Sequence, residues 1–390
     1  MPSRVHPRLD ADLLILGGGL AGLSLAARLC RSSYCGRVLV LEPRQDYSDD
    51  RSWGFWARDS QPLAERAEHS WSRWQIGRAG EPPATCSASG WRYRYVRSGS
   101  VYAEARQAIE ASVNVELRLG SAATALQAAG SALRVDTERG PLFAAQVIDT
   151  RPPAPEQRAG ATLFQAFAGY ELESVDACFE PSTVELMTEL RCDSGGLVFS
   201  YVLPLSPHRA LVELTRFSPR PLPRGELEAE LDALIARRGW TGAARLRSEY
   251  AVLPMGLPAA PALPAGALRA GVAGGGLRAA SGYGFLRIQA WADRCAAALA
   301  RGGSALGHPP EPRLRRWMDA VFLQVLKREP ERAPELFLRL ARGVSGGAFV
   351  RFMSDCAGPL DYVQVMTALP PLPFLRAAFS ARSLPAGAAH

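Results

Sequence analysis

The chain has 390 residues, of which 47% are apolar and 21% charged, and a net charge of +7. This composition excludes a disordered chain, and the length predicts two packed domains or one domain with a large insertion. Lys327 is the only lysine, and the arginines are scattered rather than gathered into a basic run. We therefore expect no nucleic-acid partner, while the excess of arginine is compatible with an anionic membrane surface.

The N-terminus has no apolar signal-peptide core, and no stretch reaches the roughly 18 apolar residues of a membrane span. The seven cysteines are an odd number and show no metal-ligand spacing, so we expect no metal site. These features predict a cytoplasmic protein that is soluble or peripherally associated with a membrane. They leave the oligomeric state open.

The first forty residues predict a βαβ unit. An apolar strand at 12–16 runs into GGGLAG, a helix follows, and a second strand at 38–42 ends in an acid. Gly17, Gly19 and Gly22 match the dinucleotide fingerprint, in which the helix N-terminus receives the pyrophosphate. Glu42 lies where it can hold ribose hydroxyls. The extreme N-terminal position and a second glycine-rich segment favour FAD over NAD.

That second segment, 271–300, is predicted to begin in a strand-like stretch, LRAGVAG (268–274), to turn through Gly274–Gly276, and to be helical from about Gly284. In FAD enzymes such a segment returns to the flavin, although it is also compatible with an ordinary αβ unit. Between the two glycine-rich segments, alternating stretches predict an antiparallel sheet. From about 312 to 353 the chain is expected to be helical, with breaks at Pro330 and Pro334.

The expected fold is α/β: an FAD-binding doubly wound Rossmann-type domain with an inserted antiparallel β-sheet substrate domain and a C-terminal helical region. The discontinuous FAD domain is assigned to 1–75, about 91–160 and 262–305. The substrate domain is assigned to about 76–90 and 161–261, and the helical region to 306–390.

Two short stretches carry candidate chemistry. DDRSWGFW, 49–56, places an acid, an arginine and three aromatics where flavin-binding loops start, or else it is a loop that plugs the core. In ALVELTRFS, 210–218, strand alternation places Leu211, Glu213 and Thr215 on one face. A carboxyl among apolar neighbours holds its proton more readily than in water, which suits a general acid. A solvent-facing strand acid is the alternative.

At these residues the chain resembles the flavoprotein lycopene cyclases over nearly its whole length. DRSWGFW, FEPSTVELM, YVLPLSPHRALVELT, YAVLPMG and AGGGLRAASGYGFLRIQ occur in the family's order. The resemblance implies a redox-neutral lycopene β-cyclase that uses reduced FAD, with NADPH as the reductant, on lycopene or a related linear carotenoid. It also implies that an acid protonates the terminal double bond, that the cation closes a ring, and that a proton is then lost.

The resemblance assigns Glu213 as the proton donor or its partner. It suggests Trp53, Phe55, Trp56, Tyr283 and Phe285 as cavity aromatics. The predicted FAD-binding residues are Gly17, Gly19, Leu20, Ala21, Gly22, Glu42, Arg51, Trp53, Gly274, Gly275, Gly276, Gly282 and Tyr283.

The chain departs from the family pattern in three places. Leu214 replaces the second acid of the family's catalytic stretch. Thr188 follows Met187, where the family often has an acid after its Leu-Met pair, and Val272 stands where related flavoproteins often carry Asp or Thr. A redox flavoenzyme of the same fold, such as a monooxygenase or an isoprenoid reductase, and a non-catalytic polyene-binding protein therefore stay open as alternatives. Ring type and the number of rings closed stay open as well.

Overall fold

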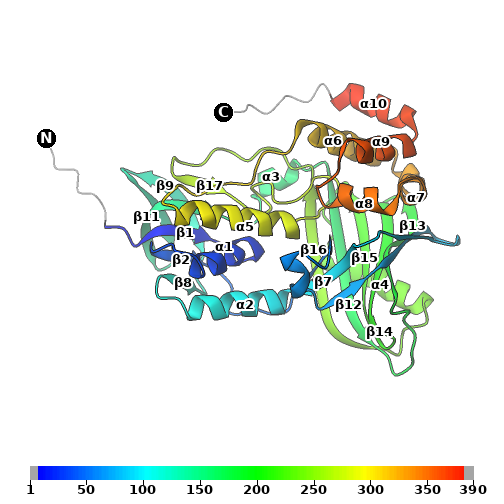
Figure 1. Cartoon of the computed structure of the whole chain (residues 1–390), viewed down its shortest axis with the longest axis horizontal. Helices are drawn as coiled ribbons and strands as arrows, with labels where there is room; N and C mark the ends of the chain where they lie inside the picture. The colour runs from blue at the N-terminus through cyan, green and yellow to red at the C-terminus, as the bar shows by residue number, and fades with distance from the viewer. Residues whose placement is uncertain (1–7, 382–390) are drawn as a thin grey trace.

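The computed structural model describes residues 8–381. Figure 1 shows an α/β part at the left, a large curved sheet at the right, and the C-terminal helices above that sheet. The predicted mixed α/β fold with a C-terminal helical region is confirmed. The proposed domain boundaries stay a prediction.

The first sheet has seven strands, and the βαβ unit forms its centre. β1 (Ala11–Leu16) pairs in parallel with β2 (Val38–Leu41) and with β11 (Gly140–Asp149). β1, β2 and the last three residues of β11 are almost entirely buried, as is usual for parallel strands covered on both faces. Three helices cover one face: α1 (Leu20–Cys30), α2 (Ser98–Glu110) and α5 (Phe285–Ala300). The other strands are β8 (Val115–Arg118), β9 (Ala123–Ala129), β10 (Ala132–Thr137) and β17 (Ala267–Arg269).

The second sheet also has seven strands, in the order β16, β12, β15, β14, β13, β5 and β6. It is antiparallel as predicted, except that β5 runs parallel to β13. One face packs on α4 (Arg224–Arg237), and the other faces the C-terminal helices. The strands are β16 (Ala244–Met255), β12 (Leu163–Glu173), β15 (Arg209–Ser218), β14 (Gly196–Ser206), β13 (Thr183–Asp193), β5 (Arg73–Arg78) and β6 (Ala84–Ser87).

Residues 49–51 of the DDRSWGFW segment lie in a loop, but the rest of the segment does not, contrary to the expectation. Its residues Ser52–Ala57 form β3, which pairs with β7 (Arg92–Arg97), and β4 (His69–Trp71) completes a three-stranded sheet. Backbone pairing with β7, about forty residues away, is a tertiary constraint that local composition does not reveal. β3 still lies beside the α/β part of the molecule, because it contacts α5, one of the helices that cover the first sheet.

The C-terminal helices are α6 (Arg313–Arg328), α7 (Ala333–Gly343), α8 (Gly346–Met353), α9 (Pro359–Ala368) and α10 (Pro371–Ala381). The expected break at Pro330 is present, but Pro334 lies in the first turn of α7 and does not interrupt it. A proline is tolerated there because the first helical N–H groups have no partner within the helix. The remaining helical segments are short: α3 (Pro155–Ala159) and two 3-10 helices at Pro62–Arg66 and Pro330–Arg332.

A buried ion pair ties the second glycine-rich segment to this helical region. The guanidinium of Arg278 lies 3.1 Å from the Asp319 carboxylate of α6, and both side chains are at most 3% exposed. Arg278 also donates to the carbonyl oxygen of Phe352 on α8. Since a buried charge is costly without its partner, this pair fixes the helices relative to the glycine-rich segment.

We predict that Asp319→Ala lowers the free energy of unfolding by about 3 kcal/mol, because it leaves the buried Arg278 charge with only a 3.8 Å contact to Asp355. Urea denaturation followed by circular dichroism measures this difference. The matched control is Asp232→Ala, which removes an exposed pair with Arg245 at 2.8 Å and should cost about 1 kcal/mol or less. Equal losses in the two variants would contradict the assigned role of the buried pair.

Candidate active site

The predicted dinucleotide turn has the geometry that a phosphate group needs. Gly17 has a φ of +98°, and a side chain on Gly22 would collide with the carbonyl oxygen of Gly17. A Cβ on Gly19, in contrast, would meet no atom within 4 Å, so the backbone is open on that side. No side chain caps α1, whose first residues are Leu20 and Ala21. Its N-terminal N–H groups are therefore available to an anion.

Glu42 ends β2 and reaches back to this turn. Its carboxylate accepts a hydrogen bond from the N–H of Gly18 at 2.6 Å and one from the Arg44 guanidinium at 2.8 Å. Burial raises the pKa of Glu42, but these hydrogen bonds outweigh the effect, so its pKa lies below the usual range. Glu42 is therefore an anionic acceptor at the position predicted for ribose hydroxyls.

The second glycine-rich segment returns to the same place. A Cβ on Gly271 would lie 3.3 Å from the Cβ of Ala21, so the segment passes directly over the start of α1. The turn at Gly274, Gly275 and Gly276 follows, and Gly275 is open to space with a φ of +87°. Only Ala267–Arg269 of the expected strand is formed. The predicted helix begins at Phe285.

Arg51 directly precedes β3, and Trp53 lies on it. The Arg51 guanidinium is hydrogen-bonded to Asp50 at 2.6 Å, and Trp53 stacks on Phe285 with ring centroids 5.6 Å apart. Phe55 stacks on Phe285 too, at 4.8 Å. These aromatics pack against the start of α5. Trp56, on the other face of β3, contacts Tyr283 instead, with ring centroids 5.5 Å apart.

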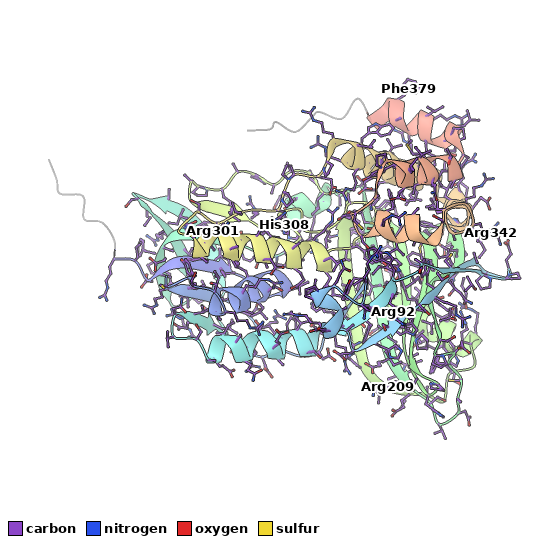
Figure 2. All side chains as sticks on the ribbon, viewed as in Figure 1. Arg92, Arg209, Arg301, His308, Arg342 and Phe379 are labelled. Atoms are coloured by element: carbon purple, nitrogen blue, oxygen red, sulfur yellow. The ribbon has the colours of Figure 1, made fainter. Side chains whose placement is uncertain are left out.

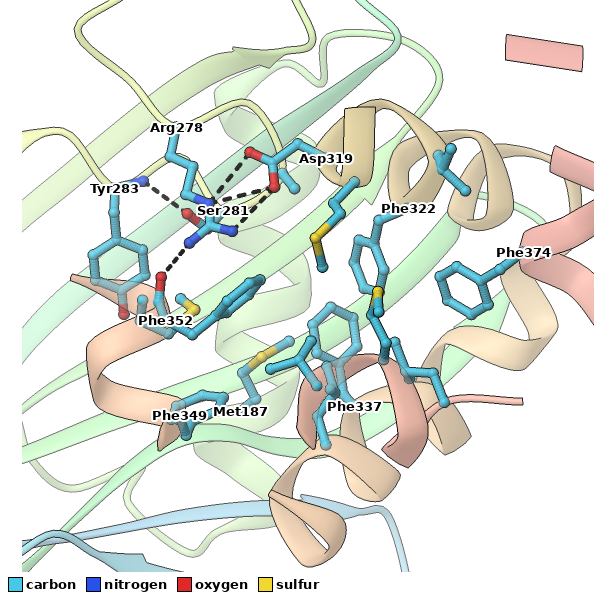
Figure 3. A pocket seen from close by; sticks show the side chains of 18 of the residues that line it. Met187, Arg278, Ser281, Tyr283, Asp319, Phe322, Phe337, Phe349, Phe352 and Phe374 are labelled. Atoms are coloured by element: carbon cyan, nitrogen blue, oxygen red, sulfur yellow. Dashed lines mark hydrogen bonds and ion pairs between the residues drawn. The ribbon is translucent and has the colours of Figure 1, made fainter. Parts of the chain in front are cut away.

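A cavity of about 310 Å³ lies between the large sheet and the C-terminal helices, and its lining is mostly aliphatic and aromatic. Figure 3 shows Met187, Phe337 and Phe349 on its walls, with the Arg278–Asp319 pair at one side. Trp56 and Tyr283 line it as predicted, but Trp53, Phe55 and Phe285 do not. The cavity reaches the outside beside α6, α9 and α10, where Trp317, Met366 and Leu375 both line it and are exposed.

Glu213 lies beyond the inner end of this cavity, on the face of β15 that the alternation predicted. Its backbone pairs with Tyr201 of β14, a residue of the cavity wall. Within residues 8–381, no side chain donates a hydrogen bond to the Glu213 carboxyl. Burial, and then the neighbouring Glu249 carboxylate, raise the pKa of Glu213 well above its usual range. The carboxyl therefore holds its proton more readily than a carboxyl in water does.

Tyrosines surround this acid, and two of them also line the cavity. Tyr93, Tyr201 and Tyr283 each interact electrostatically with Glu213, and burial raises the pKa of all three phenols. Neutral phenol rings present electron-rich faces, which stabilise nearby positive charge without adding a base. Sequence reasoning found Tyr283 but missed Tyr93 and Tyr201, because cross-strand register places them here.

The sequence also missed an acid. Leu214 points to the opposite face, where it packs with Leu227 and Leu231 of α4, so no acid follows Glu213 along its own strand. Glu249 of β16 lies instead on the same face as Glu213, and it is 3% exposed. Thr188, the other departure, is hydrogen-bonded to Ser200 at 3.0 Å and donates to the Glu185 carboxylate. Because Ser200 pairs with Leu214, Thr188 lies on the face of the sheet opposite Glu213. Val272 lies in the turn after β17.

Several buried side-chain oxygens of residues 8–381 have no hydrogen-bond partner, and two of them, Gln165 Oε1 and Thr215 Oγ1, belong to the large sheet. Both lie on strands of the large sheet, on the face that carries Glu213. A Cβ on Gly282 would come within 2.6 Å of the Gln165 oxygen, so the second glycine-rich segment closes over this face. Unpaired buried acceptors are rare in proteins and indicate a place where a polar group binds.

Comparisons with known proteins agree with this geometry. A family model described as "Lycopene cyclase protein" matches residues 12–379. The chain is 29% identical to a lycopene beta-cyclase of Paracoccus sp. (strain N81106 / MBIC 01143), over 93% of this chain and 95% of that protein. It is 25% identical to a lycopene beta-cyclase of Pantoea ananas, over 94% of this chain and 96% of that protein.

Solved structures are similar in fold at lower identity. A geranylgeranyl bacteriochlorophyll reductase-like protein from Thermoplasma acidophilum has a TM-score of 0.60 at 14% identity, covering 96% of this chain and 99% of that one. The halogenase PltM, in complex with phloroglucinol and FAD, has a TM-score of 0.55 at 13% identity, covering 95% of this chain and 94% of that one. The chain thus has a Rossmann-type flavoprotein fold, and by the family match along nearly all its length it belongs to the lycopene cyclase family.

Proposed function

We propose that this protein is a lycopene β-cyclase: a redox-neutral, FAD-dependent isomerase that closes β-ionone rings at the ends of lycopene. The observation that carries the proposal is a carboxyl with a raised pKa, Glu213, which pairs with the cavity-wall residue Tyr201 on the face of the sheet that borders an apolar cavity. Family membership gives the substrate class, since the matched relatives are lycopene beta-cyclases.

The chemistry follows from this arrangement. Glu213 donates its proton to the terminal double bond, the neighbouring alkene attacks the resulting cation, and a ring proton is then lost. An apolar cavity excludes the water that would otherwise capture the cation. The aromatic faces of Trp56, Tyr201 and Tyr283 line the cavity and would stabilise positive charge that develops there.

The residues that support FAD binding are the open backbone at Gly19, the anionic Glu42 and the turn at Gly274–Gly276. The unpaired oxygens of Gln165 and Thr215 provide acceptors for polar edges of the flavin ring. Bound reduced FAD would supply an electron-rich ring that stabilises the cation. NADPH is the reductant we propose.

A redox flavoenzyme of the same fold is the second candidate, because the fold is shared with a reductase-like protein and with a halogenase. Fold alone does not fix chemistry. The products distinguish the candidates: a cyclase product has the mass of its substrate, a reductase adds two hydrogens, and a monooxygenase adds one oxygen.

We also propose that the protein is cytoplasmic and rests on a membrane surface. Within residues 8–381, no helix combines the length and the apolar character that crossing a bilayer requires. Eight exposed large apolar side chains gather on α6, α9 and α10, around the opening of the cavity, and Figure 2 shows Phe379 at the outer side of α10. They are Leu314, Trp317, Leu360, Val363, Met366, Leu372, Leu375 and Phe379.

This apolar face fits lipid for two reasons. Contiguous exposed apolar surface marks an interaction site, and a long hydrocarbon substrate dissolved in the bilayer would reach the cavity directly from it. In addition, the exposed Arg313 and Arg316 of α6 would meet anionic headgroups, and α10 contains no acidic residue.

We predict that Gly19→Val folds normally but binds FAD about tenfold or more weakly, because its side chain would occupy the space left for the pyrophosphate. Gly19 has a φ of −76°, which any residue adopts, and its Cβ would meet no atom within 4 Å. Fluorescence titration of the apoprotein with FAD and its thermal melting give the two readouts. Unchanged FAD affinity with normal folding would refute the assigned pyrophosphate position.

Glu213→Gln is expected to lower the rate of lycopene conversion by about a hundredfold or more, the usual contribution of a general acid. The measurement is chromatography with mass detection of pigments formed by purified protein with reduced FAD. Glu185→Gln is the matched control, since this acid lies on β13 of the same sheet in a surface pair with Arg238. Full activity of a folded, flavin-containing Glu213→Gln variant would remove Glu213 from the mechanism.

The double variant Leu372→Glu/Phe379→Glu is predicted to bind vesicles about tenfold or more weakly, because two apolar side chains no longer enter the lipid. Flotation with vesicles of equal parts phosphatidylcholine and phosphatidylglycerol measures the bound fraction. Val113→Glu changes an exposed apolar residue between α2 and β8 and should not change the bound fraction. If all three proteins float alike, or none floats, the proposed membrane face is wrong.

A further inference from the structure

Glu213 and Glu249 occupy one row across the large sheet, on either side of Gly169. In the antiparallel register, Gly169 of β12 pairs with Glu213 of β15 on one side and with Glu249 of β16 on the other. The same row continues to Tyr201 of β14. Residues paired in this way direct their side chains to the same face of the sheet.

The residue between the two acids has no side chain, and the acids use the space this leaves. A Cβ on Gly169 would lie 2.7 Å from the Cγ of Glu213 and 3.3 Å from the Cγ of Glu249. Both acids therefore lean over the glycine toward each other. A larger residue at 169 would force them apart, so this row brings two buried carboxyl groups together.

The two carboxyls have opposite surroundings. Glu249 accepts hydrogen bonds from the Ser52 hydroxyl at 3.0 Å and from the Arg247 guanidinium at 3.1 Å. Arg247 in turn contacts Glu171, and Glu171 contacts Arg209, which reaches the surface. Burial raises the pKa of Glu249 too, but Arg247 and the Ser52 hydrogen bonds oppose this effect. Within the described part of the chain Glu213 has no such hydrogen-bond partners, so Glu249 is the member of the pair better placed to hold the negative charge.

Glu213 has no such donors among the described residues and faces Tyr93, Tyr201 and Tyr283. Two carboxylates this close do not both ionise readily, because like charges in a low-dielectric interior repel. With the charge fixed on Glu249, the shared proton stays on Glu213, on the side of the apolar cavity.

We propose that Glu249 is the positioning residue of the proton donor: it holds the negative charge of a carboxyl pair across Gly169, keeps the proton on Glu213, and drives its return after ring closure. This inference rests on the proposed function, in which Glu213 is the donor. It also accounts for Leu214, because the second acid comes from β16 rather than from the next position on β15.

The proton balance closes within one turnover. The π electrons of the terminal alkene form a C–H bond with the Glu213 proton, which leaves a carbon cation and a second carboxylate beside Glu249. The neighbouring alkene attacks the cation and forms the ring C–C bond. The electrons of a ring C–H bond then form the new double bond, and the released proton returns to Glu213, whose basicity the adjacent Glu249 charge increases.

The test is the pH profile of conversion of lycopene in detergent micelles by holoenzyme with reduced FAD. Activity should fall as pH rises through the pKa of Glu213, because only the protonated form donates. In Glu249→Gln, and in Glu249→Met as a second neutral variant, the fall should occur about one pH unit lower, because the neighbouring charge is gone. Glu249→Asp keeps the charge and should retain the wild-type midpoint.

Infrared difference spectroscopy gives a second readout that needs no turnover. The band of the protonated Glu213 carboxyl is identified as the carbonyl band that is absent from Glu213→Gln. This band should titrate at lower pH in Glu249→Gln and Glu249→Met than in the wild type. Lower activity at every pH with an unshifted midpoint would mean a merely structural role and would overturn the inference. Failure of the proposed function gives a different result, namely no isomerisation by the wild type or full activity of Glu213→Gln.

Discussion

A carboxyl group that keeps its proton in the interior, beside a hydrocarbon cavity, is the constraint on which the rest of this structure depends. Burial supplies the larger part of the pKa shift of Glu213, and the Glu249 carboxylate adds to it. A cation formed next to this acid must also be protected from water, and the wall of aromatic and aliphatic side chains provides that protection. One cavity therefore meets both requirements, a poised acid and a dry reaction space.

The architecture brings the parts of this site together from distant segments. The large sheet supplies the acids, β3 supplies Trp56, and the second glycine-rich segment supplies Tyr283. The buried Arg278–Asp319 pair holds that segment against α6, so the dinucleotide-type turn and the cavity are parts of one rigid arrangement. The opening of the cavity then coincides with the apolar face of α6, α9 and α10, which links the proposed membrane contact to substrate access.

Local periodicity was enough to predict much of this arrangement. The βαβ unit, the position of Glu42, and the face of β15 that carries Glu213 all follow from spacing within one segment. Glu249 did not follow, because its proximity to Glu213 depends on how β15, β12 and β16 pair, which is a property of the whole sheet. The strand at Ser52–Ala57 was missed for the same reason, since its partner β7 lies far along the chain.

The measurement that tests the central claim most directly is the mass of the pigment that purified protein forms from lycopene in deuterium oxide, under anaerobic conditions with reduced FAD. If an exchangeable protein acid starts the reaction, the ring-containing isomer formed in the first turnover of protein equilibrated with deuterium oxide carries deuterium, because the ring proton released to Glu213 has not yet been used again. A first-turnover product without deuterium would contradict donation by Glu213. A product that has gained a pair of hydrogens or an oxygen would contradict redox-neutral cyclisation and identify a redox flavoenzyme instead.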